Sequence, residues 1–512
     1  MIAKLLSAAL FGVDAFIVEV EIDVSNGLPS FNIVGLPDTA VQESRERVRS
    51  AIKNTEFQFP MQRITVNLAP ANVKKEGPAL DLPIAVGILS ANRQIDFATH
   101  NNDFIIIGEL SLNGQIRPVS GMLSIALMAR KKGIKNLIVP RENAREASIV
   151  DGINIIPVSG LREIARFLNN EINIIPMSID KYELMKNVNN YQVDFSDVKG
   201  QNHAKRALEV AAAGSHNVIM IGPPGSGKTM LAKRIPTILP SLTLEESIEI
   251  TRLYSVSNLP KHDLPIVTNR PFRSPHHTIS NIGLIGGGRI PKPGEISMAH
   301  NGVLFLDELP EFNRSALESL RQPLESGKVT VSRTLRSVTY LSHFMLIAAA
   351  NPCPCGFFGD PVKQCTCTSQ QIRKYKSKIS GPLLDRIDIQ IEVPRLDYRE
   401  LANRNVDNEN STAIRNRVEK ARIIQQKRFK DIPIFGNSQM KRKEIEKYCK
   451  LPEEGWNLLN KAMDKLKLSA RAYDKILKLS RTIADLSFSE EINISHLSEA
   501  IQYRSMDRED LI

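Results

Sequence analysis

One run of residues, from Gly222 to Thr229, has the composition and spacing to bind a nucleotide polyphosphate. It fits the pattern GxxxxGK followed by Ser or Thr, and it follows the apolar run Val218–Ile221. The residues of this loop are Gly222, Pro223, Pro224, Gly225, Ser226, Gly227, Lys228 and Thr229. Glycines let backbone N–H groups turn toward phosphate oxygens, Lys228 adds a cation, and Thr229 offers a hydroxyl to Mg²⁺. We therefore predict ATP and Mg²⁺ as cofactors, the alternative being a glycine-rich turn without a ligand.

Two further positions would complete a hydrolytic site. Asp307 and Glu308 follow the apolar run Val303–Leu306, and Asn351 follows Leu346–Ala350. Carboxyl ends of parallel strands meet at one edge of a sheet, so these residues would lie beside the phosphate loop. Asp307 would hold Mg²⁺ through the ion's coordination shell, Glu308 would orient and deprotonate the attacking water, and Asn351 would donate to the γ-phosphate or to that water. Taken alone, each pattern also occurs in structural turns.

Arg386 is a candidate for the cation that stabilises a transferred phosphoryl group. It lies in the run Gly381–Asp388, between apolar strand and loop signals. A cation delivered to the γ-phosphate oxygens contributes about a thousandfold or more in rate. We expect Arg386 to act on the nucleotide of a neighbouring subunit, the alternative being a surface ion pair.

Four of the five cysteines fall in one short loop and have the composition of a metal site. Cys353 and Cys355 are followed by Cys365 and Cys367. Four thiolates suit a tetrahedral Zn²⁺ ion, and a closed four-sulfur shell is typical of a structural role. The spacing is CxC instead of the commoner CxxC, so free thiols are the alternative. Cys449 stands alone, and we expect it in the core.

A basic hairpin is expected before the cysteines. Apolar and polar residues alternate through 328–332 and return after Arg333 and Arg336, which is typical of a β-hairpin with arginines near its tip. The segment 326–384 has one acid, Asp360, against Lys328, Arg333, Arg336, Lys363, Arg373, Lys374, Lys376 and Lys378. This excess fits a surface that follows DNA phosphates without reading bases, and a generic basic surface is the alternative.

The long insertion between the two halves of the nucleotide site runs from about Leu259 to Ala299. It is rich in Pro and Gly, and long loops in compact domains tend to be functional or disordered. Its adjacent histidines, His276 and His277, are a weak metal signal because no second ligand pair is near in sequence. We therefore interpret them as loop-packing residues.

These candidate residues require several elements to position them, and 512 residues allow three or so domains. Residues 1–170 mix strand and helix patterns, 171–197 form a linker, 198–395 contain the phosphate loop, and 396–512 are helical in pattern. We therefore predict an α/β fold with a C-terminal helical lid.

The first domain begins with residues that alternate as strands do. Ala15–Val24 predicts a strand, Asn26-Gly27 a tight turn, and Ser30–Val34 a returning strand. Asp38 can cap a helix running to about Lys53. Further strand and helix candidates are Arg63–Leu68, Leu82–Ala91, Phe104–Ile107, Met122–Lys131, Asn136–Val139, Asn154–Pro157 and Leu161–Phe167.

The last domain carries periodic apolar positions that predict helices throughout. The expected helices are Thr412–Phe429, Lys441–Cys449, Glu453–Leu466, Ser469–Leu486 and Ser495–Tyr503. The first of them is basic, which leaves binding of a partner there open.

The overall composition narrows the choice of partner and compartment. Lys and Arg number 67 against 56 Asp and Glu, a net charge of +11 that favours a polyanionic partner. No apolar stretch is long enough to span a membrane. Leu5–Val13 resembles the core of a signal peptide, but it lacks a cleavage site and continues into strand-like residues, so we expect a cytoplasmic protein.

Two stretches of the first domain, Lys74–Leu80 and Gly108–Val119, resemble the proteolytic domain of Lon-type proteases. That family uses a serine nucleophile activated by a lysine. The serine position falls on Ala79 and the lysine position on Leu123, and neither side chain can attack or deprotonate. The resemblance implies a Lon-protease-like scaffold without peptidase chemistry.

The phosphate loop, the run ending in Asp307-Glu308, the insertion Arg270–Ile296 and the run Gly381–Asp388 together resemble the magnesium-chelatase-like branch of AAA+ ATPases. With the Lon-like first domain, the whole chain is similar to the competence-associated ComM/YifB family. The resemblance implies a hexameric ring ATPase that acts as a branch-migration helicase on single-stranded or branched DNA, with the insertion projecting toward the pore. In AAA+ lids an arginine at the position of Arg471 reaches the nucleotide, the alternative being an exposed helix arginine.

Three functions compete at this stage, and the leading one is an ATP-driven DNA motor. A motor subunit of a metal chelatase would share the ATPase core, but the chelatase ATPase subunits that we compare lack a Lon-like first domain. An ATP-dependent protease is disfavoured by Ala79 and Leu123.

Overall fold

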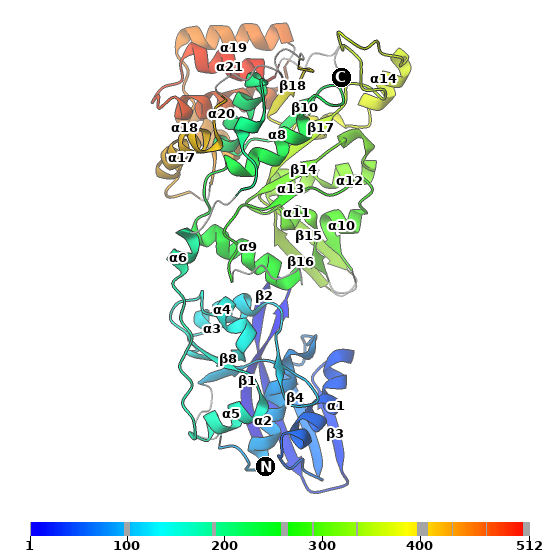
Figure 1. Ribbon diagram of the computed structural model, residues 1–512, viewed down its shortest axis with the longest axis vertical. Helices are drawn as coiled ribbons and strands as arrows, with labels where there is room; N and C mark the ends of the chain where they lie inside the picture. Colours follow the sequence, from blue (N-terminus) through cyan, green and yellow to red (C-terminus); the bar gives the residue numbers. More distant parts are fainter. Residues whose placement is uncertain are drawn as a thin grey trace. The chain divides into compact units, whose positions relative to one another are not determined.

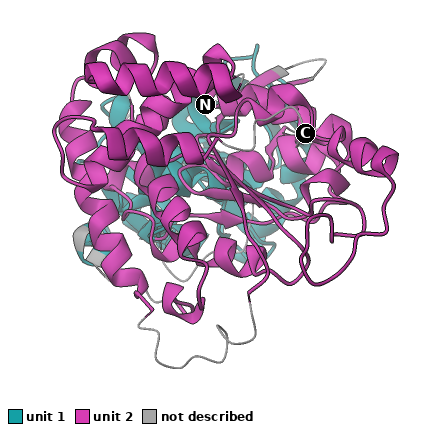
Figure 2. Ribbon diagram, turned by 90° about the horizontal axis from the view of Figure 1, so that it is seen from above, with its two compact units in different colours: residues 1–187, 247–268 teal, residues 188–246, 269–512 magenta. Residues whose placement is uncertain are grey.

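The computed structural model describes residues 2–96, 103–186, 191–257, 265–288, 291–333, 336–396, 408–432, 434–466 and 468–504. The chain forms two units, coloured separately in Figure 2. The first contains residues 1–187 and 247–268, and the second contains 188–246 and 269–512. Each unit has its own sheet and its own hydrophobic core.

A mixed seven-stranded sheet forms the centre of the first unit (Figure 1). Its strands, in spatial order, are β3 (Ser30–Val34), β4 (Arg63–Ala69), β2 (Asp14–Ser25), β1 (Ile2–Phe11), β5 (Phe104–Ile106), β8 (Asn136–Pro140) and β9 (Asn154–Val158). Strand β2 pairs antiparallel with β1 and β4, and the other neighbours are parallel. A short ladder joins β6 (Glu109–Leu110) to β7 (Ile116–Arg117).

The helices of the first unit pack on this sheet and its connections. They are α1 (Thr39–Asn54), α2 (Asp81–Ala91), α3 (Met122–Lys131), α4 (Arg141–Ala147), α5 (Leu161–Leu168) and α6 (Lys181–Lys186). Asp38 caps α1 by accepting from the Val41 N–H at 2.8 Å, which confirms the predicted start of that helix. The segment 247–268 joins the unit through Ser255, whose hydroxyl donates to Glu146 at 2.5 Å.

One expectation for this unit was wrong. The strand after Asn26-Gly27 does not return along β2, because β4 occupies that edge and β3 pairs in parallel with β4 instead. Most of the run Leu5–Val13, which we did not assign to a signal peptide, belongs to β1 and pairs with β2. Strand pairing depends on distant segments, so the local turn signal was not enough to choose the partner.

The two Lon-like stretches meet in the first unit. The N–H of Gly108 donates to the carbonyl oxygen of Ala79 at 3.0 Å. Ala79 lies in the short 3-10 turn Pro78–Leu80, and Leu123 lies fully buried in α3. A methyl group and a buried isobutyl group therefore stand where the resemblance expects a nucleophile and its base.

A parallel five-stranded sheet organises the second unit (Figure 1). Its spatial order is β11 (Phe272–Arg273), β14 (Val303–Leu306), β17 (Met345–Ala350), β10 (Val218–Ile221) and β18 (Ile389–Glu392). Strand β10 lies between β17 and β18, which follow it by more than a hundred residues. The order therefore reverses at β10, and ligands of open parallel sheets bind at the carboxyl end of such a strand.

Helices and small ladders surround this sheet. The helices are α7 (Asn202–Gly214), α8 (Lys228–Arg234), α10 (Asn281–Ile285), α11 (Glu295–Met298), α12 (Arg314–Ser319), α13 (Arg321–Ser326), α14 (Ser369–Lys376) and α15 (Gly381–Leu384). A further helix, α9 (Leu244–Ser257), belongs to the first unit from Ser247 onward. The ladders join β12 (Gly286–Gly287) to β13 (Lys292–Pro293), and β15 (Lys328–Arg333) to β16 (Arg336–Leu341). The β15–β16 pair confirms the predicted hairpin.

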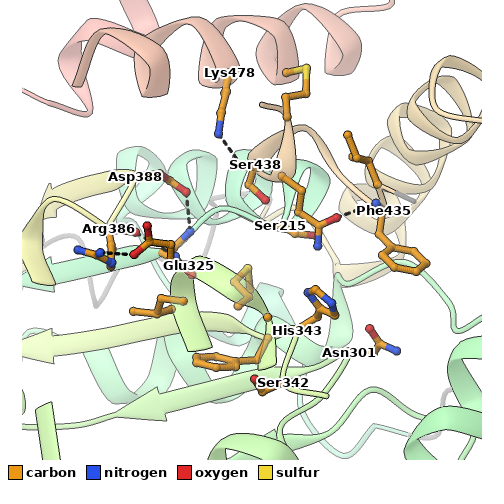
Figure 3. Close-up of a pocket in the computed structure, with 18 of the residues that line it drawn as sticks. Ser215, Asn301, Glu325, Ser342, His343, Arg386, Asp388, Phe435, Ser438 and Lys478 are labelled. Carbon is orange, nitrogen blue, oxygen red and sulfur yellow. Dashed lines mark hydrogen bonds and ion pairs between the residues drawn. The ribbon is translucent and has the colours of Figure 1, made fainter. Parts of the chain in front are cut away.

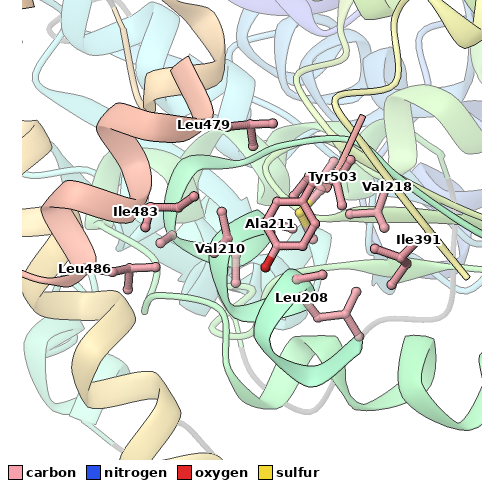
Figure 4. Packing of buried hydrophobic residues seen from close by; sticks show 14 of the residues in the cluster. Leu208, Val210, Ala211, Val218, Ile391, Leu479, Ile483, Leu486 and Tyr503 are labelled. Atoms are coloured by element: carbon pink, nitrogen blue, oxygen red, sulfur yellow. The ribbon is translucent and has the colours of Figure 1, made fainter. Parts of the chain in front are cut away.

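The C-terminal helices agree closely with the periodic pattern. They are α17 (Ser411–Arg428), α18 (Arg442–Tyr448), α19 (Glu453–Leu466), α20 (Ala470–Leu486) and α21 (Ile494–Gln502). Figure 4 shows Leu479 and Ile483 of α20 beside Val210 and Ala211 of α7, within one buried hydrophobic cluster. This shared core stabilises the packing of the helices against the strands. Among the described helices, none combines the length and apolarity that crossing a membrane requires.

Candidate functional site

The phosphate loop connects β10 directly to α8, as the motif predicts. Gly225 and Gly227 have φ values of 78° and 92°, a region that favours glycine. A Cβ on Gly222 would lie 2.1 Å from the Val393 carbonyl oxygen, so only glycine fits there. Residues 228–234 continue as α8, and its N-terminal N–H groups and positive dipole end suit a bound phosphate.

Lys228 is the partly buried cation of this loop. Its Nζ donates to the carbonyl oxygens of Gly222 at 2.7 Å and Pro223 at 2.8 Å, and it lies 3.3 Å from Asn351 Oδ1. Burial lowers the pKa of Lys228 to about 8, while Asp307 and Glu308 act in the opposite direction. The amine is therefore positioned between the loop and Asn351, where it can reach a phosphate oxygen.

The two residues predicted to bind Mg²⁺, Thr229 and Asp307, also lie together. The Thr229 hydroxyl donates to Asp307 Oδ2 at 2.7 Å, and Asp307 Oδ1 accepts from the Glu308 N–H at 3.0 Å. The hydroxyl comes from α8 and the carboxylate from the end of β14. The two groups lie close together because β14, β17 and β10 are parallel neighbours and end at the same edge of the sheet. Oxygen ligands of this kind are those that Mg²⁺ prefers.

Glu308 has a partner that the sequence interpretation missed. Its backbone is left-handed, with φ 52°, and its side chain is more than half exposed. His277 Nδ1 lies 3.6 Å from Glu308 Oε2, so a protonated imidazole would form an ion pair with the carboxylate. The histidine pair that we assigned to loop packing therefore places one ring beside the predicted catalytic base.

The four clustered cysteines converge on one point. Sγ of Cys353 lies 3.3 Å from that of Cys355 and 3.7 Å from that of Cys365, and all four sulfurs, including Cys367, lie within 4.8 Å of one another. Backbone N–H groups of Phe357 and Thr366 lower the pKa of Cys355 to about 5. Four sulfurs at this spacing, with a ready thiolate, can hold a metal ion. Cys449 is buried apart from them, as expected.

The cysteine loop packs against the phosphate loop. Gly356 has φ 88°, and a Cβ on it would lie 2.6 Å from Pro224 Cδ and 3.8 Å from the Asn351 side chain. Asn351 itself is two residues before Cys353. The metal-binding candidates therefore support the same loop that holds Lys228, a relation that no local pattern indicates.

Arg386 and Arg471 lie together, but away from the phosphate loop of their own chain. Arg386 Nη2 lies 2.5 Å from Glu325 Oε2, and Arg471 Nη1 lies 3.3 Å from Asp385 Oδ2. The Arg386 carbonyl oxygen accepts from Asn217, which precedes β10, whereas the phosphate loop follows β10. The strand of four residues, about 13 Å long, separates the two sites.

Arg333 and Arg336 face each other across the tip of the β15–β16 hairpin. Their side chains lie outside the described residues. Along the hairpin, Val331 and Tyr340 are buried, whereas Thr330 and Thr339 are exposed and 3.2 Å apart. The hairpin thus has one packed face and one polar face.

Three protein-family models match the chain. They are described as magnesium chelatase, subunit ChlI, over residues 194–401; subunit ChlI of Mg-chelatase, over 20–143; and magnesium chelatase, subunit ChlI C-terminal, over 408–504. Their combined span includes the phosphate loop, the cysteines and Arg471.

Relatives match over nearly the full length. Competence protein ComM of Haemophilus influenzae is 46% identical over 510 residues, covering 99% of this chain and 98% of the relative. The uncharacterized protein YifB of Escherichia coli is 43% identical over 501 residues, covering 98% of this chain and 96% of the relative. Lon protease 2 of Bacillus subtilis is 26% identical over 162 residues, 29% of each chain.

Proposed function

The chain belongs to the ComM/YifB family of magnesium-chelatase-like AAA+ ATPases, and from that premise we propose that it is an ATP-driven ring motor acting on DNA. The observation that carries the proposal is the separation of two groups of residues. Lys228, Thr229 and Asp307 lie at one end of β10, and Arg386 and Arg471 lie at the other. A complete hydrolytic site then needs two subunits.

ATP hydrolysis follows from the residues at the carboxyl end of the sheet. Lys228 would hold the β- and γ-phosphates, Thr229 and Asp307 would hold Mg²⁺, and Asn351 would orient the γ-phosphate. Glu308 takes the proton of the attacking water. His277, 3.6 Å from Glu308, holds that carboxylate in position. A Mg²⁺ ion held there would supply positive charge against the negative charge that develops on the phosphate.

The neighbouring subunit supplies the missing cations. Arg386 reaches the γ-phosphate of the neighbour's ATP, and Arg471 of α20 contacts the same nucleotide. Both arginines are held next to one another by Glu325 and Asp385. A homo-hexamer is the ring that we propose for this arrangement. Hydrolysis at each subunit interface changes the contacts of both arginines and thereby moves the C-terminal helices α17 to α21.

DNA is the substrate on which this motion acts. The β15–β16 hairpin carries Arg333 and Arg336 at its tip, and the chain has a net charge of +11. Arginines that contact phosphates give affinity without base specificity, which suits a motor on single-stranded or branched DNA. We place this activity in the cytoplasm, in recombination during natural transformation.

A structural Zn²⁺ ion is the metal that we propose for the cysteine cluster. A tetrahedral ion with Zn–S bonds of about 2.3 Å places its sulfurs about 3.8 Å apart, close to the spacing of these four thiols. The Cys355 N–H also lies 3.3 Å from the Cys367 sulfur, as backbone donors do around metal-bound thiolates. No position is left for a substrate, so the role is to hold the loop.

A motor subunit of a metal chelatase is the second candidate, favoured by the descriptions of the three family models. One of them covers residues 20–143, so the first domain does not separate the two functions by itself. The test is to measure ATP turnover with and without single-stranded and branched DNA. Stimulation by DNA supports the motor. If the ATP turnover rate does not change with DNA but rises with a large chelatase subunit, the chelatase function is the correct one and the DNA motor is wrong.

A further inference from the structure

A cavity of about 750 Å³ lies at the end of the sheet opposite the phosphate loop. Figure 3 shows Asp388, Ser215, His343 and Asn301 around it. Its walls come from residues that precede the strands of the second unit, from the end of α13, and from α17 and α20. The volume lies in the range of sites that bind small molecules.

Most cations in the wall of this cavity have a carboxylate partner. Arg386 is paired with Glu325, and Lys475 Nζ lies 3.2 Å from Asp388 Oδ1. Arg270 Nη2 lies 2.9 Å from the Glu246 carboxylate. Each of these three charges is therefore paired with a carboxylate within the protein.

Arg422 of α17 differs from these three cations. It lines the cavity and is only 7% exposed, yet it forms no ion pair with a carboxylate in the part of the chain that the structure describes. Its Nη1 is buried without a hydrogen-bond partner among the same residues. Burial lowers the pKa of Arg422 to about 10, with Arg270 acting in the same direction and Glu246 against it. The guanidinium is thus still charged at neutral pH, and burying such a charge without a counter-ion is costly.

A second unsatisfied polar group lies in the same wall. Ser342, labelled in Figure 3, is 1% exposed, and its hydroxyl has no hydrogen-bond partner among the described residues. Gly436 leaves room for the arginine, since a Cβ there would lie 2.7 Å from Arg422 Nη1. A guanidinium can only donate, and a hydroxyl can donate, so the two groups suit a ligand rich in acceptors.

We propose that this cavity binds a small molecule through a phosphate group, with Arg422 as the counter-ion and Ser342 as a hydrogen-bond donor. A phosphate has the charge and the several oxygens that a planar guanidinium contacts in a bidentate manner. The cavity is larger than one phosphate, and Phe435 and His343 in its wall, with ring centroids 6.4 Å apart, can contact a flat ring. Arg386 and Arg471, which we assign to the ATP of a neighbouring subunit, also line this cavity, whereas Arg422 and Ser342 have no part in the proposed hydrolysis.

The test uses the full-length chain carrying Lys228→Ala, so that the phosphate loop does not contribute. Inorganic phosphate, pyrophosphate and ADP are titrated by calorimetry, and Tm is followed in parallel. We expect saturable binding that Arg422→Met weakens about tenfold or more, because it removes a charge-assisted bidentate contact. Lys420→Gln removes one positive charge from an exposed position of the same helix and should bind as the parent does.

The unfolding temperature shows whether a variant has lost its binding site or its folded structure. Without ligand, Arg422→Met should unfold at the same or a higher temperature than its parent, because an unpaired buried charge is gone. Ser342→Ala provides a second variant with a milder expected loss of affinity. Tighter binding of ADP than of phosphate would identify a nucleotide as the source of the phosphate group, and equal binding would identify free phosphate.

Three results would overturn the proposal. One is the absence of saturable binding for all three probes. Another is equal affinity in the parent and in both Arg422→Met and Ser342→Ala. The third is that Arg422→Met alters only the assembly of subunits; the counter-ion is then a carboxylate of a neighbouring copy, and the small-molecule site is wrong.

Discussion

The guanidinium of Arg471 lies 3.3 Å from the carboxylate of Asp385, the residue immediately before Arg386. The pair joins α20 to the residue that ends α15, ahead of β18, at the end of the sheet away from the phosphate loop. Two arginines that would both serve a nucleotide are thus held together, yet apart from the loop of their own chain. This arrangement predicts that each ATP site is built from the residues of two subunits.

The first prediction concerns mixed rings. Lys228→Ala and Arg386→Ala should each lose ATP turnover, the second by about a thousandfold, because the transition state loses its cation. When the two variants are mixed, some seams combine an intact loop with an intact Arg386, so part of the activity should return. Turnover is measured against the mixing ratio. A mixture that stays as inactive as its components would show that Arg386 acts within its own chain.

The second prediction concerns the catalytic base. Glu308→Gln should keep nucleotide binding and lose turnover by about a hundredfold or more, as loss of a general base does. Glu311→Gln is the matched control, since Glu311 lies on the same loop, is exposed and pairs with Lys378 at 3.2 Å. Binding of a fluorescent nucleotide and steady-state turnover distinguish the two effects. Equal turnover in Glu308→Gln and Glu311→Gln would remove the assignment.

Local patterns in the sequence were sufficient for the elements that carry the chemistry. The phosphate loop, the strand before Asp307 and the C-terminal helices follow from motif spacing and periodicity, because each depends on residues close in sequence. Pairings between distant segments were not predictable in the same way. The partner of β3, the approach of His277 to Glu308 and the contact of Arg471 with Asp385 join residues that no spacing rule connects.

Buried polar groups were equally hidden from the sequence. Arg422 belongs to a basic helix whose charges we read as a possible surface for a partner, yet its side chain is buried against the cavity. Gly356 gave no signal of its contact with Pro224. In both positions the tertiary packing, and not the residue type, decides the role.

The third prediction is a pH dependence of nucleotide affinity. Because burial lowers the pKa of Lys228 to about 8, the ammonium group of Lys228 in the nucleotide-free protein loses its proton as the pH rises through 8. ATP needs the ammonium form, so its Kd should rise above that pH, by up to about tenfold per unit. Lys228→Arg stays charged and should give a flat profile from pH 7 to about 9.5. A flat wild-type profile over the same range contradicts the prediction.

The fourth prediction concerns metal removal. Wild-type protein purified without chelators should contain one Zn²⁺ ion per chain. The substitution Cys355→Ser should lower this zinc content. Because Gly356 packs on Pro224, the loss should also weaken nucleotide binding by about tenfold. Cys449→Ala, at a buried position apart from the cluster, should retain the metal. Metal analysis that finds no zinc in the wild type would disprove the four-sulfur site.

The fifth prediction concerns the hairpin tip. Each arginine that contacts a DNA phosphate adds about 0.7 to the slope of log affinity against log salt for a single strand. Replacing both Arg333 and Arg336 by alanine should therefore reduce the slope by about 1.4 and weaken binding at low salt. Lys461→Ala, at an exposed position of α19 outside the segment 326–384, provides a control for loss of one basic residue. Fluorescence anisotropy with a labelled oligonucleotide measures both quantities. An unchanged slope in the double variant would mean that the tip does not touch the DNA backbone, and the path of the strand through the ring would have to be sought on another surface.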